Sequence, residues 1–159
     1  MFDFFLGKSI PAIFFLSFFI LFSCAKPCRQ WELDTIRSDC PGICYGKASL
    51  AACSTFNGLE AEILAIDGGL RFYLNALSLE FPVVEGNEDY TTVILFIGDQ
   101  EHPFLADRFQ GGQQLLLPEE AQNLIIETLL QKYEVDIKVG RYQTTLVPNN
   151  FYASYLKLK

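Results

Sequence analysis

Side chains that carry common enzyme chemistry are scarce in this sequence. Its 159 residues include one histidine, one tryptophan and one methionine. Neither a Gly-x-Ser-x-Gly nucleophile elbow nor a phosphate-binding Gly-x4-Gly-Lys-Ser/Thr loop occurs. One histidine leaves little scope for acid–base catalysis near neutral pH, where imidazole is the side chain that titrates. We therefore expect no cofactor and no metal site, and we assign no catalytic residue.

Positive charge is also scarce, because 12 Lys and Arg face 19 Asp and Glu and give a formal net charge of −7. This charge would repel phosphates and argues against a nucleic-acid binder. Charged residues make up 19% of the chain and apolar residues 50%. That balance excludes a disordered tail, a collagen-like chain and a coiled coil, and the length predicts one domain.

A hydrophobic run long enough to cross a membrane is absent as well. The longest segment, Ile10–Phe22, holds thirteen residues, or about 20 Å of helix against a hydrocarbon core of about 30 Å. Lys8 prevents its extension toward the N-terminus. A short leading segment, an apolar run of this length and a small residue after it are typical of a secretory signal. We expect residues 1–23 to be a signal peptide.

The end of this segment, Leu21-Phe22-Ser23-Cys24, resembles the lipobox of bacterial lipoproteins. The resemblance implies cleavage before Cys24, a diacylglycerol on its thiol and an acyl chain on its freed amine. Residues 24–30 would then be a short tether and residues 31–159 one globular domain. The resemblance implies a lipid-anchored protein of the bacterial cell envelope, and Ala25 after the cysteine favours the periplasmic face of the outer membrane. An ordinary cleaved signal and an uncleaved anchor remain as alternatives.

The cysteine count agrees with a lipid on Cys24. Five cysteines leave one over in an exported protein. Without Cys24 four remain, and an oxidising compartment favours two disulfides among Cys28, Cys40, Cys44 and Cys53. If residues 31–36 and 48–56 form a hairpin around Pro41-Gly42, its register favours Cys28–Cys53 and Cys40–Cys44, whose numbers add up to 81 and 84. A zinc site and reduced thiols are the alternatives.

The rest of the sequence alternates polar and apolar residues between turn signals, which predicts a mainly β (α+β) fold, an antiparallel β-sandwich or barrel-like domain. Asp67-Gly68-Gly69 predicts a hairpin between Leu59–Ile66 and the next strand. Tyr90–Ile97 is apolar enough to be the central buried strand, with a partner over 104–109. Further strands are expected over 113–117, 135–139 and 142–146.

One amphipathic helix is expected over about 118–132, opened by Pro118 and two acids, with Lys132 at its C-terminal end. The apolar phase changes near Ala76, which a bulge or a change of sheet would explain. Phe151–Leu158 is either a short strand or a helical turn. This order of elements resembles small exported β-sandwich families such as the invasion-associated locus B type and type VI secretion accessory periplasmic proteins. In general texture the chain also resembles small lipoproteins of chlamydia-like bacteria. Neither resemblance carries a functional residue with it.

Candidate functional side chains are few, and each also has a structural interpretation. His102 lies in a predicted loop with Asp99 and Glu101, a set that could bind a divalent metal. Trp31 is expected in the core, and the glycine pairs Gly68-Gly69 and Gly111-Gly112 in turns. Tyrosines near the C-terminus could form a recognition surface or pack in the core: Tyr142, Tyr152 and Tyr155. Carboxylates could supply a general acid and base for glycan cleavage: Glu60, Glu62, Glu80, Glu85, Glu88 and Asp89.

Two functions follow from these features. The first is a non-catalytic binding or accessory module, held on the membrane by its N-terminal lipid, for another envelope component such as a protein. The second is an envelope hydrolase that uses Asp and Glu carboxylates. A flat apolar patch or an exposed sheet edge would favour the first function. Paired acids in one deep cleft would favour the second.

Overall fold

A computed structural model describes residues 29–37, 44–54, 56–66 and 68–158. It confirms the predicted fold class, because these residues form one antiparallel sheet of nine strands with two helices. The elements are β1 (Glu32–Arg37), β2 (Cys44–Leu50), β3 (Leu59–Ile66), β4 (Gly69–Ala76), β5 (Tyr90–Ile97), β6 (Gln100–Arg108), β7 (Gln114–Leu116), α2 (Glu119–Leu130), β8 (Val135–Val139), β9 (Tyr142–Leu146) and α3 (Phe151–Leu158).

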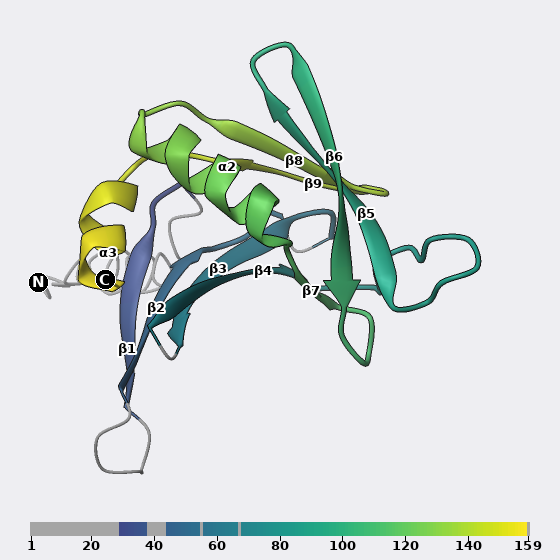
Figure 1. The fold of residues 1–159 in the computed structure, drawn as a ribbon, viewed down its shortest axis with the longest axis horizontal. Coiled ribbons are helices and arrows are strands. Elements are labelled where there is room, and N and C mark those ends of the chain that lie inside the picture. The colour runs from purple at the N-terminus through teal and green to yellow at the C-terminus, as the bar shows by residue number, and fades with distance from the viewer. Residues whose placement is uncertain (1–28, 38–43, 55, 67, 159) are drawn as a thin grey trace, which may run out of the picture.

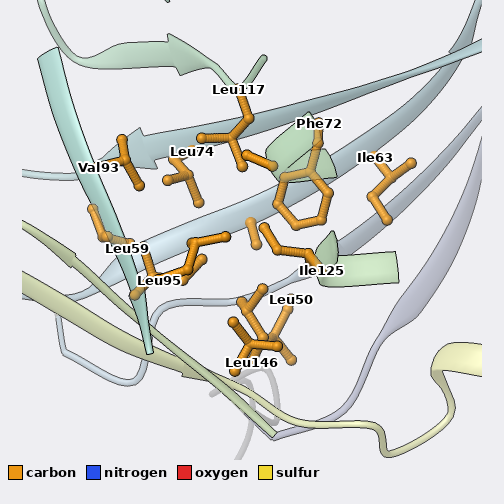
Figure 2. Packing of buried hydrophobic residues seen from close by; sticks show 14 of the residues in the cluster. Leu50, Leu59, Ile63, Phe72, Leu74, Val93, Leu95, Leu117, Ile125 and Leu146 are labelled. Atoms are coloured by element: carbon orange, nitrogen blue, oxygen red, sulfur yellow. The ribbon is translucent and has the colours of Figure 1, made fainter. Parts of the chain in front are cut away.

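The strands follow the order β1-β2-β3-β4-β7-β6-β5-β8-β9. The short strand β7 pairs with β4 on one side and with β6 on the other, and so joins two groups of hairpins into one sheet. The sheet bends strongly, so that the β8–β9 hairpin lies across from β3 and β4 with α2 between them (Figure 1). Apolar side chains from both halves and from α2 meet in a single core (Figure 2).

The alternation of polar and apolar residues predicted both ends of β3 correctly. Leu59, Ala61 and Ile63 are buried while the residues between them are partly exposed, as expected for a strand with one face on the core. The register pairs Ile66 with Gly69, so the strands are joined by a tight connection that contains Gly68. Gly68 has φ +77°, a conformation that glycine adopts without steric cost. The predicted hairpin is confirmed.

The predicted helix is also confirmed, with shorter bounds. Pro118 occupies the position before the first helical residue, and Glu119 and Glu120 lie in the first turn, where negative charge complements the helix dipole. The helix ends at Leu130, and Lys132 lies outside it with φ +67°. Our placement of Lys132 at the end of the helix was therefore wrong, because the chain has already turned toward β8.

Three other expectations need correction. The second strand covers Cys44–Leu50 rather than 48–56. Strand β5 is third from the β9 edge, and alternate side chains are buried, so it is not the central strand. The change of phase near Ala76 is the end of β4, because Leu77 and Leu79 are about half exposed. Periodicity alone cannot distinguish a strand that changes face from a strand that has ended.

The C-terminal segment, for which strand and helical turn were both open, is the helix α3. Its buried residues are Phe151, Ser154, Tyr155 and Leu158, a spacing of three and four that only a helix brings to one face. The helix packs against β1, β2 and α2. The phenyl ring of Phe151 stacks on Tyr155 at a centroid distance of 5.7 Å.

The two ends of the described chain are joined at Trp31. The indole N–H donates to the Val147 carbonyl at 2.8 Å, and the backbone N–H donates to the Asn149 carbonyl at 3.1 Å. Asn150 returns a bond from its side-chain amide to the Trp31 carbonyl at 2.8 Å. The fully buried indole ring also meets Phe151 edge-on at 5.1 Å. The prediction that Trp31 belongs to the core is confirmed.

Candidate functional site

The predicted lipid and disulfide residues lie mostly outside the described part of the chain. Cys24, Cys28 and Cys40 are outside it, and only the backbone of Cys44 is described, opposite Arg37 in the β1–β2 pair. Cys53 is described and is not a free thiol. The pairing of the cysteines stays a prediction.

His102 lies on β6 rather than in a loop. The loop is shorter than expected, because Ile97 pairs directly with Gln100 and only Gly98 and Asp99 turn the chain. Neighbouring residues of a strand point to opposite faces, so Glu101 and His102 are directed away from each other. Within the described ranges, no group of three His, Cys, Asp or Glu side chains could hold a metal ion.

Two of the candidate carboxylates are engaged by cations. Glu62 forms an ion pair with Lys47 across the β2–β3 pair, and Glu80 pairs with Arg108 at 2.6 Å. Glu60 is half-buried on β3. The remaining acids are exposed in the segment that precedes β5: Glu85, Glu88 and Asp89.

The surface that stands out is the segment Leu77–Val83 between β4 and β5, which we call the ledge. It contains no helix or strand. Leu77 is 50% exposed, Leu79 52% and Val83 49%, while Phe81 between them is buried. The exposed ring of Phe56 belongs to the same surface, because Ser78 donates its hydroxyl to the Phe56 carbonyl at 2.9 Å.

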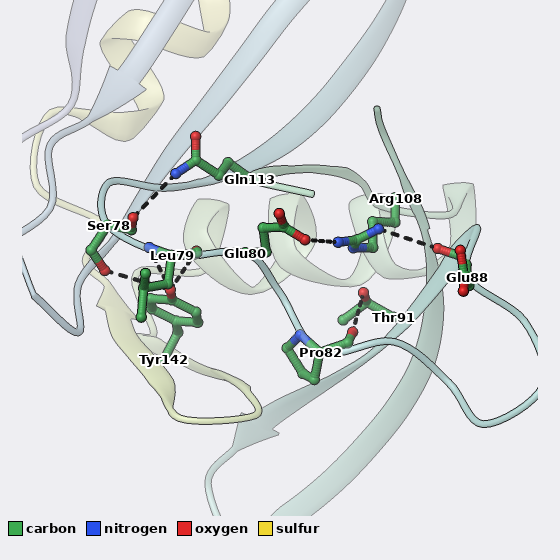
Figure 3. A network of polar contacts seen from close by, with 9 residues as sticks. All are labelled: Ser78, Leu79, Glu80, Pro82, Glu88, Thr91, Arg108, Gln113 and Tyr142. Carbon is green, nitrogen blue, oxygen red and sulfur yellow. Dashed lines mark hydrogen bonds and ion pairs between the residues drawn. The ribbon is translucent and has the colours of Figure 1, made fainter. Parts of the chain in front are cut away.

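Tyr142 of β9 holds the centre of the ledge. Its ring is fully buried, and its hydroxyl accepts a bond from the Leu79 N–H at 3.0 Å and donates to the Leu79 carbonyl at 2.5 Å (Figure 3). One phenol thus satisfies both backbone groups of Leu79. With its backbone fixed in this way, Leu79 presents an apolar side chain to solvent from a rigid support.

The other ledge residues are held in the same manner. The Ser78 carbonyl accepts a bond from the Gln113 side chain at 3.3 Å, and the Pro82 carbonyl accepts one from Thr91 at 2.7 Å. The Phe81 N–H donates to the Gly112 carbonyl at 2.7 Å, and the Phe81 ring meets Tyr142 edge-on at 5.3 Å. Each residue from 78 to 82 is therefore attached to the sheet or to its turns.

Glu80 is attached through Arg108, whose side chain is only 14% exposed. The guanidinium lies against Gly112, where an added Cβ would stand 2.0 Å from Arg108 Nη2. Gly112 also has φ +65°, a backbone conformation that favours glycine, and a side chain at this position would displace the Arg108 guanidinium. Gly111 and Gly112 form the turn between β6 and β7, as predicted, and this turn additionally makes room for the Arg108–Glu80 pair.

A hollow of about 500 Å³ borders the ledge. Its walls are Leu79, Glu80, Pro82, Gly140, Arg141 and Tyr142. The Arg141 guanidinium lies 5.0 Å from the centre of the Tyr142 ring and 6.0 Å from that of Phe56, and it donates to the Tyr142 hydroxyl at 3.0 Å. The hollow therefore combines an apolar wall, one cation and one carboxylate.

The same contacts change the acidity of Tyr142. Burial raises the pKa of its phenol, but the bonds with Ser78, Arg141 and the Leu79 backbone, together with the Arg141 charge, lower it more. The net pKa of Tyr142 lies below its usual value of 10.0. Of the three C-terminal tyrosines, Tyr142 and Tyr155 are buried as expected, while Tyr152 is 61% exposed.

No protein-family model, curated protein or solved structure matches this sequence. In the described part of the chain, neither helix is long and apolar enough to cross a membrane. Function is therefore inferred from the surface itself. The sequence prediction missed the ledge because it interpreted the change of phase near Ala76 as a bulge or a change of sheet. Leu77, Leu79 and Phe81 at alternate positions were the signal in the sequence.

Proposed function

We propose that this protein is a lipid-anchored component of the bacterial cell envelope, and that its domain binds a partner protein through the ledge. The observation that carries the proposal is the combination of exposed apolar side chains at Leu77, Leu79 and Val83 with hydrogen bonds or an ion pair at each residue from 78 to 82. Apolar residues that gather on a surface beside a polar rim mark interaction sites. The adjoining hollow offers room for one side chain of the partner.

Rigid presentation matters for the free energy of association. A mobile loop would lose backbone freedom on binding, which costs roughly 1–2 kcal/mol per residue that becomes ordered. The ledge is already held by Tyr142, Thr91 and the Gly112 carbonyl, so little of this cost remains. Burial of Leu79 then contributes its hydrophobic free energy to the complex.

The arrangement of carboxylates gives less support to the alternative, an envelope hydrolase. The groove between α2 and the β3–β4 hairpin contains two acids, Glu119 and Glu127, beside Arg71. They lie eight residues apart on one helix, about 12 Å along its axis, whereas glycosidase carboxyl groups stand about 5–9.5 Å apart. Turnover of a glycan, peptide or ester that disappears on replacing one of these acids would favour the hydrolase.

The anchor is the first testable part of the proposal. A Cys24→Ser variant is expected to accumulate as an uncleaved precursor, because the lipid is attached to the cysteine thiol before the signal is removed. Mass spectrometry of the native protein is expected to find acyl chains on Cys24 as the first residue. An unmodified Cys24 in the mature chain would contradict the anchor.

We also propose the disulfide pairings Cys28–Cys53 and Cys40–Cys44. In an antiparallel pair of strands, the numbers of facing residues add up to a constant, which is 81 for β1 and β2. The numbers 28 and 53 also add up to 81, so Cys28 and Cys53 fit the same register. In addition, Cys53 and Arg29, which follows Cys28, line the same hollow. A link between these positions would tie the tether to the loop after β2.

The binding surface is tested by replacing Leu79 with aspartate. A charge placed at the centre of an apolar contact is expected to weaken capture of the partner from solubilised envelopes at least about thirtyfold, the effect of losing about 2 kcal/mol at a binding hot spot. Leu105→Asp is the matched control, since Leu105 on β6 is 56% exposed and Leu79 52%. The free energy of unfolding of both variants is expected to lie within about 0.5 kcal/mol of the wild-type value. Equal capture by the two variants would contradict the proposal.

A further inference from the structure

A second apolar surface lies on α3, away from the ledge. The side chains that α3 turns to solvent are Tyr152, Ala153, Leu156 and Lys157, four residues that share one face of the helix. Tyr152 is 61% exposed and Leu156 53%. A surface helix of a soluble domain normally has polar residues on this face. Here the face contains one cation and no acid.

This surface lies where the described chain begins. The side-chain amide of Asn149 donates to the Arg29 carbonyl at 3.1 Å, and Asn149 lines one hollow of about 540 Å³ together with Lys132 and Tyr152. Arg29 follows Cys24 by five residues, a length of chain that spans at most about 18 Å. A lipid on Cys24 would therefore hold α3 close to the bilayer.

The side of α3 that faces solvent carries one cation and no acid, in a chain of net charge −7. Two further cations, Arg29 and Lys132, line the hollows beside it. The acids that line the neighbouring hollows are Glu134, Glu119 and Glu127. Cations beside exposed Tyr and Leu side chains are typical of helices that lie at an anionic lipid surface.

We infer that the exposed face of α3 rests on the lipid bilayer beside the anchor. The ledge then lies farther from the membrane than α3, because the connection between β4 and β5 lies away from α3 along the molecule's longest axis (Figure 1). This inference rests on the anchoring part of the proposed function. It also leaves the ledge accessible to a partner that is not embedded in the same bilayer.

The test places a tryptophan at each end of the full-length, lipidated protein. Leu156→Trp reports on α3 and Leu79→Trp on the ledge, and the two positions match in exposure at 53% and 52%. The proteins are reconstituted in vesicles of phosphatidylcholine and phosphatidylglycerol, with or without brominated acyl chains that quench nearby tryptophan. Trp31 is fully buried and contributes the same background to both variants.

Brominated chains are expected to lower the added emission of Leu156→Trp about twofold and to leave that of Leu79→Trp unchanged, because only α3 reaches the acyl boundary. No quenching at 156, or quenching at 79 instead, overturns the inference. Acyl chains on Cys24 are measured by mass spectrometry in the same samples, so the anchor can stand while the α3 contact fails. If Cys24 is unmodified, a blue shift of Leu156→Trp on anionic vesicles at low salt still supports the contact, and an unchanged spectrum overturns it.

Discussion

Replacing Trp31 with alanine is expected to lower the free energy of unfolding by about 3–5 kcal/mol, the range for removing a large buried aromatic side chain. The indole is fully buried and contacts both Phe72 and Phe151. Its loss would leave a cavity between the start of the chain and α3, and would leave the Val147 carbonyl without its donor. Guanidinium unfolding followed by circular dichroism measures the change.

Trp31→Phe separates the two contributions. It retains most of the apolar contact and removes the 2.8 Å bond to Val147, so we expect it to lose about 1–3 kcal/mol. Asn150→Ala, which removes the bond to the Trp31 carbonyl, is expected to act in the same direction with a smaller effect. If the free energy of unfolding of Trp31→Ala lies within about 1 kcal/mol of the wild-type value, then Trp31 does not join the two ends of the domain as described.

Replacing Tyr142 with phenylalanine is expected to release the ledge while the ring stays in the core. Both backbone groups of Leu79, which are partly buried, lose their partner, and two hydrogen bonds of about 0.5–1.5 kcal/mol each amount to about 1–3 kcal/mol. Hydrogen exchange of the Leu79 amide is expected to accelerate more than that of the core strands, since the loss is local. Binding of the partner is expected to weaken, because the ledge must then be ordered on association.

The pH dependence of stability provides a control for this variant. The folded pKa of Tyr142 lies below 10.0, so the unfolded chain binds more protons as the pH approaches 10. The wild type is therefore expected to gain stability from this group as the pH rises through the folded pKa, and Tyr142→Phe is expected to lack the gain. If the stability of the two proteins depends on pH in the same way, the pKa of the Tyr142 phenol is not lowered by folding. If hydrogen exchange of the Leu79 amide is unchanged in Tyr142→Phe, the phenol does not hold the ledge.

Local patterns predicted much of the fold. The alternation in Leu59–Ile66, the glycine at position 68 and the spacing along Phe151–Leu158 are properties of short segments, and the first two predicted their structure directly. The third left helix and strand open, because eight residues are few for a period to be decided. The single sheet depends on β7, a strand of three residues that pairs with both β4 and β6. No local sequence pattern predicts such a pairing.

The site was harder to predict than the fold. Most contacts that hold the ledge join residues far apart in the sequence, such as Arg108 with Glu80, 28 positions apart, and Tyr142 with Leu79, 63 positions apart. One sequence contains no sign of which of these side chains will meet. The expectation that His102 lies in a loop failed because of the length of the turn before it. A turn of two residues instead of a longer loop placed it on a strand and separated it from Glu101.

Site-specific photocrosslinking in intact cells tests the central claim most directly. A photoreactive amino acid replaces Leu79 in one strain and Leu105 in another, two positions of similar exposure on different parts of the surface. The proposal predicts one discrete crosslinked protein at position 79, its loss when Tyr142→Phe is added, and no such product at position 105. Equal crosslinking at both positions, or none at position 79, would contradict the ledge as the binding surface.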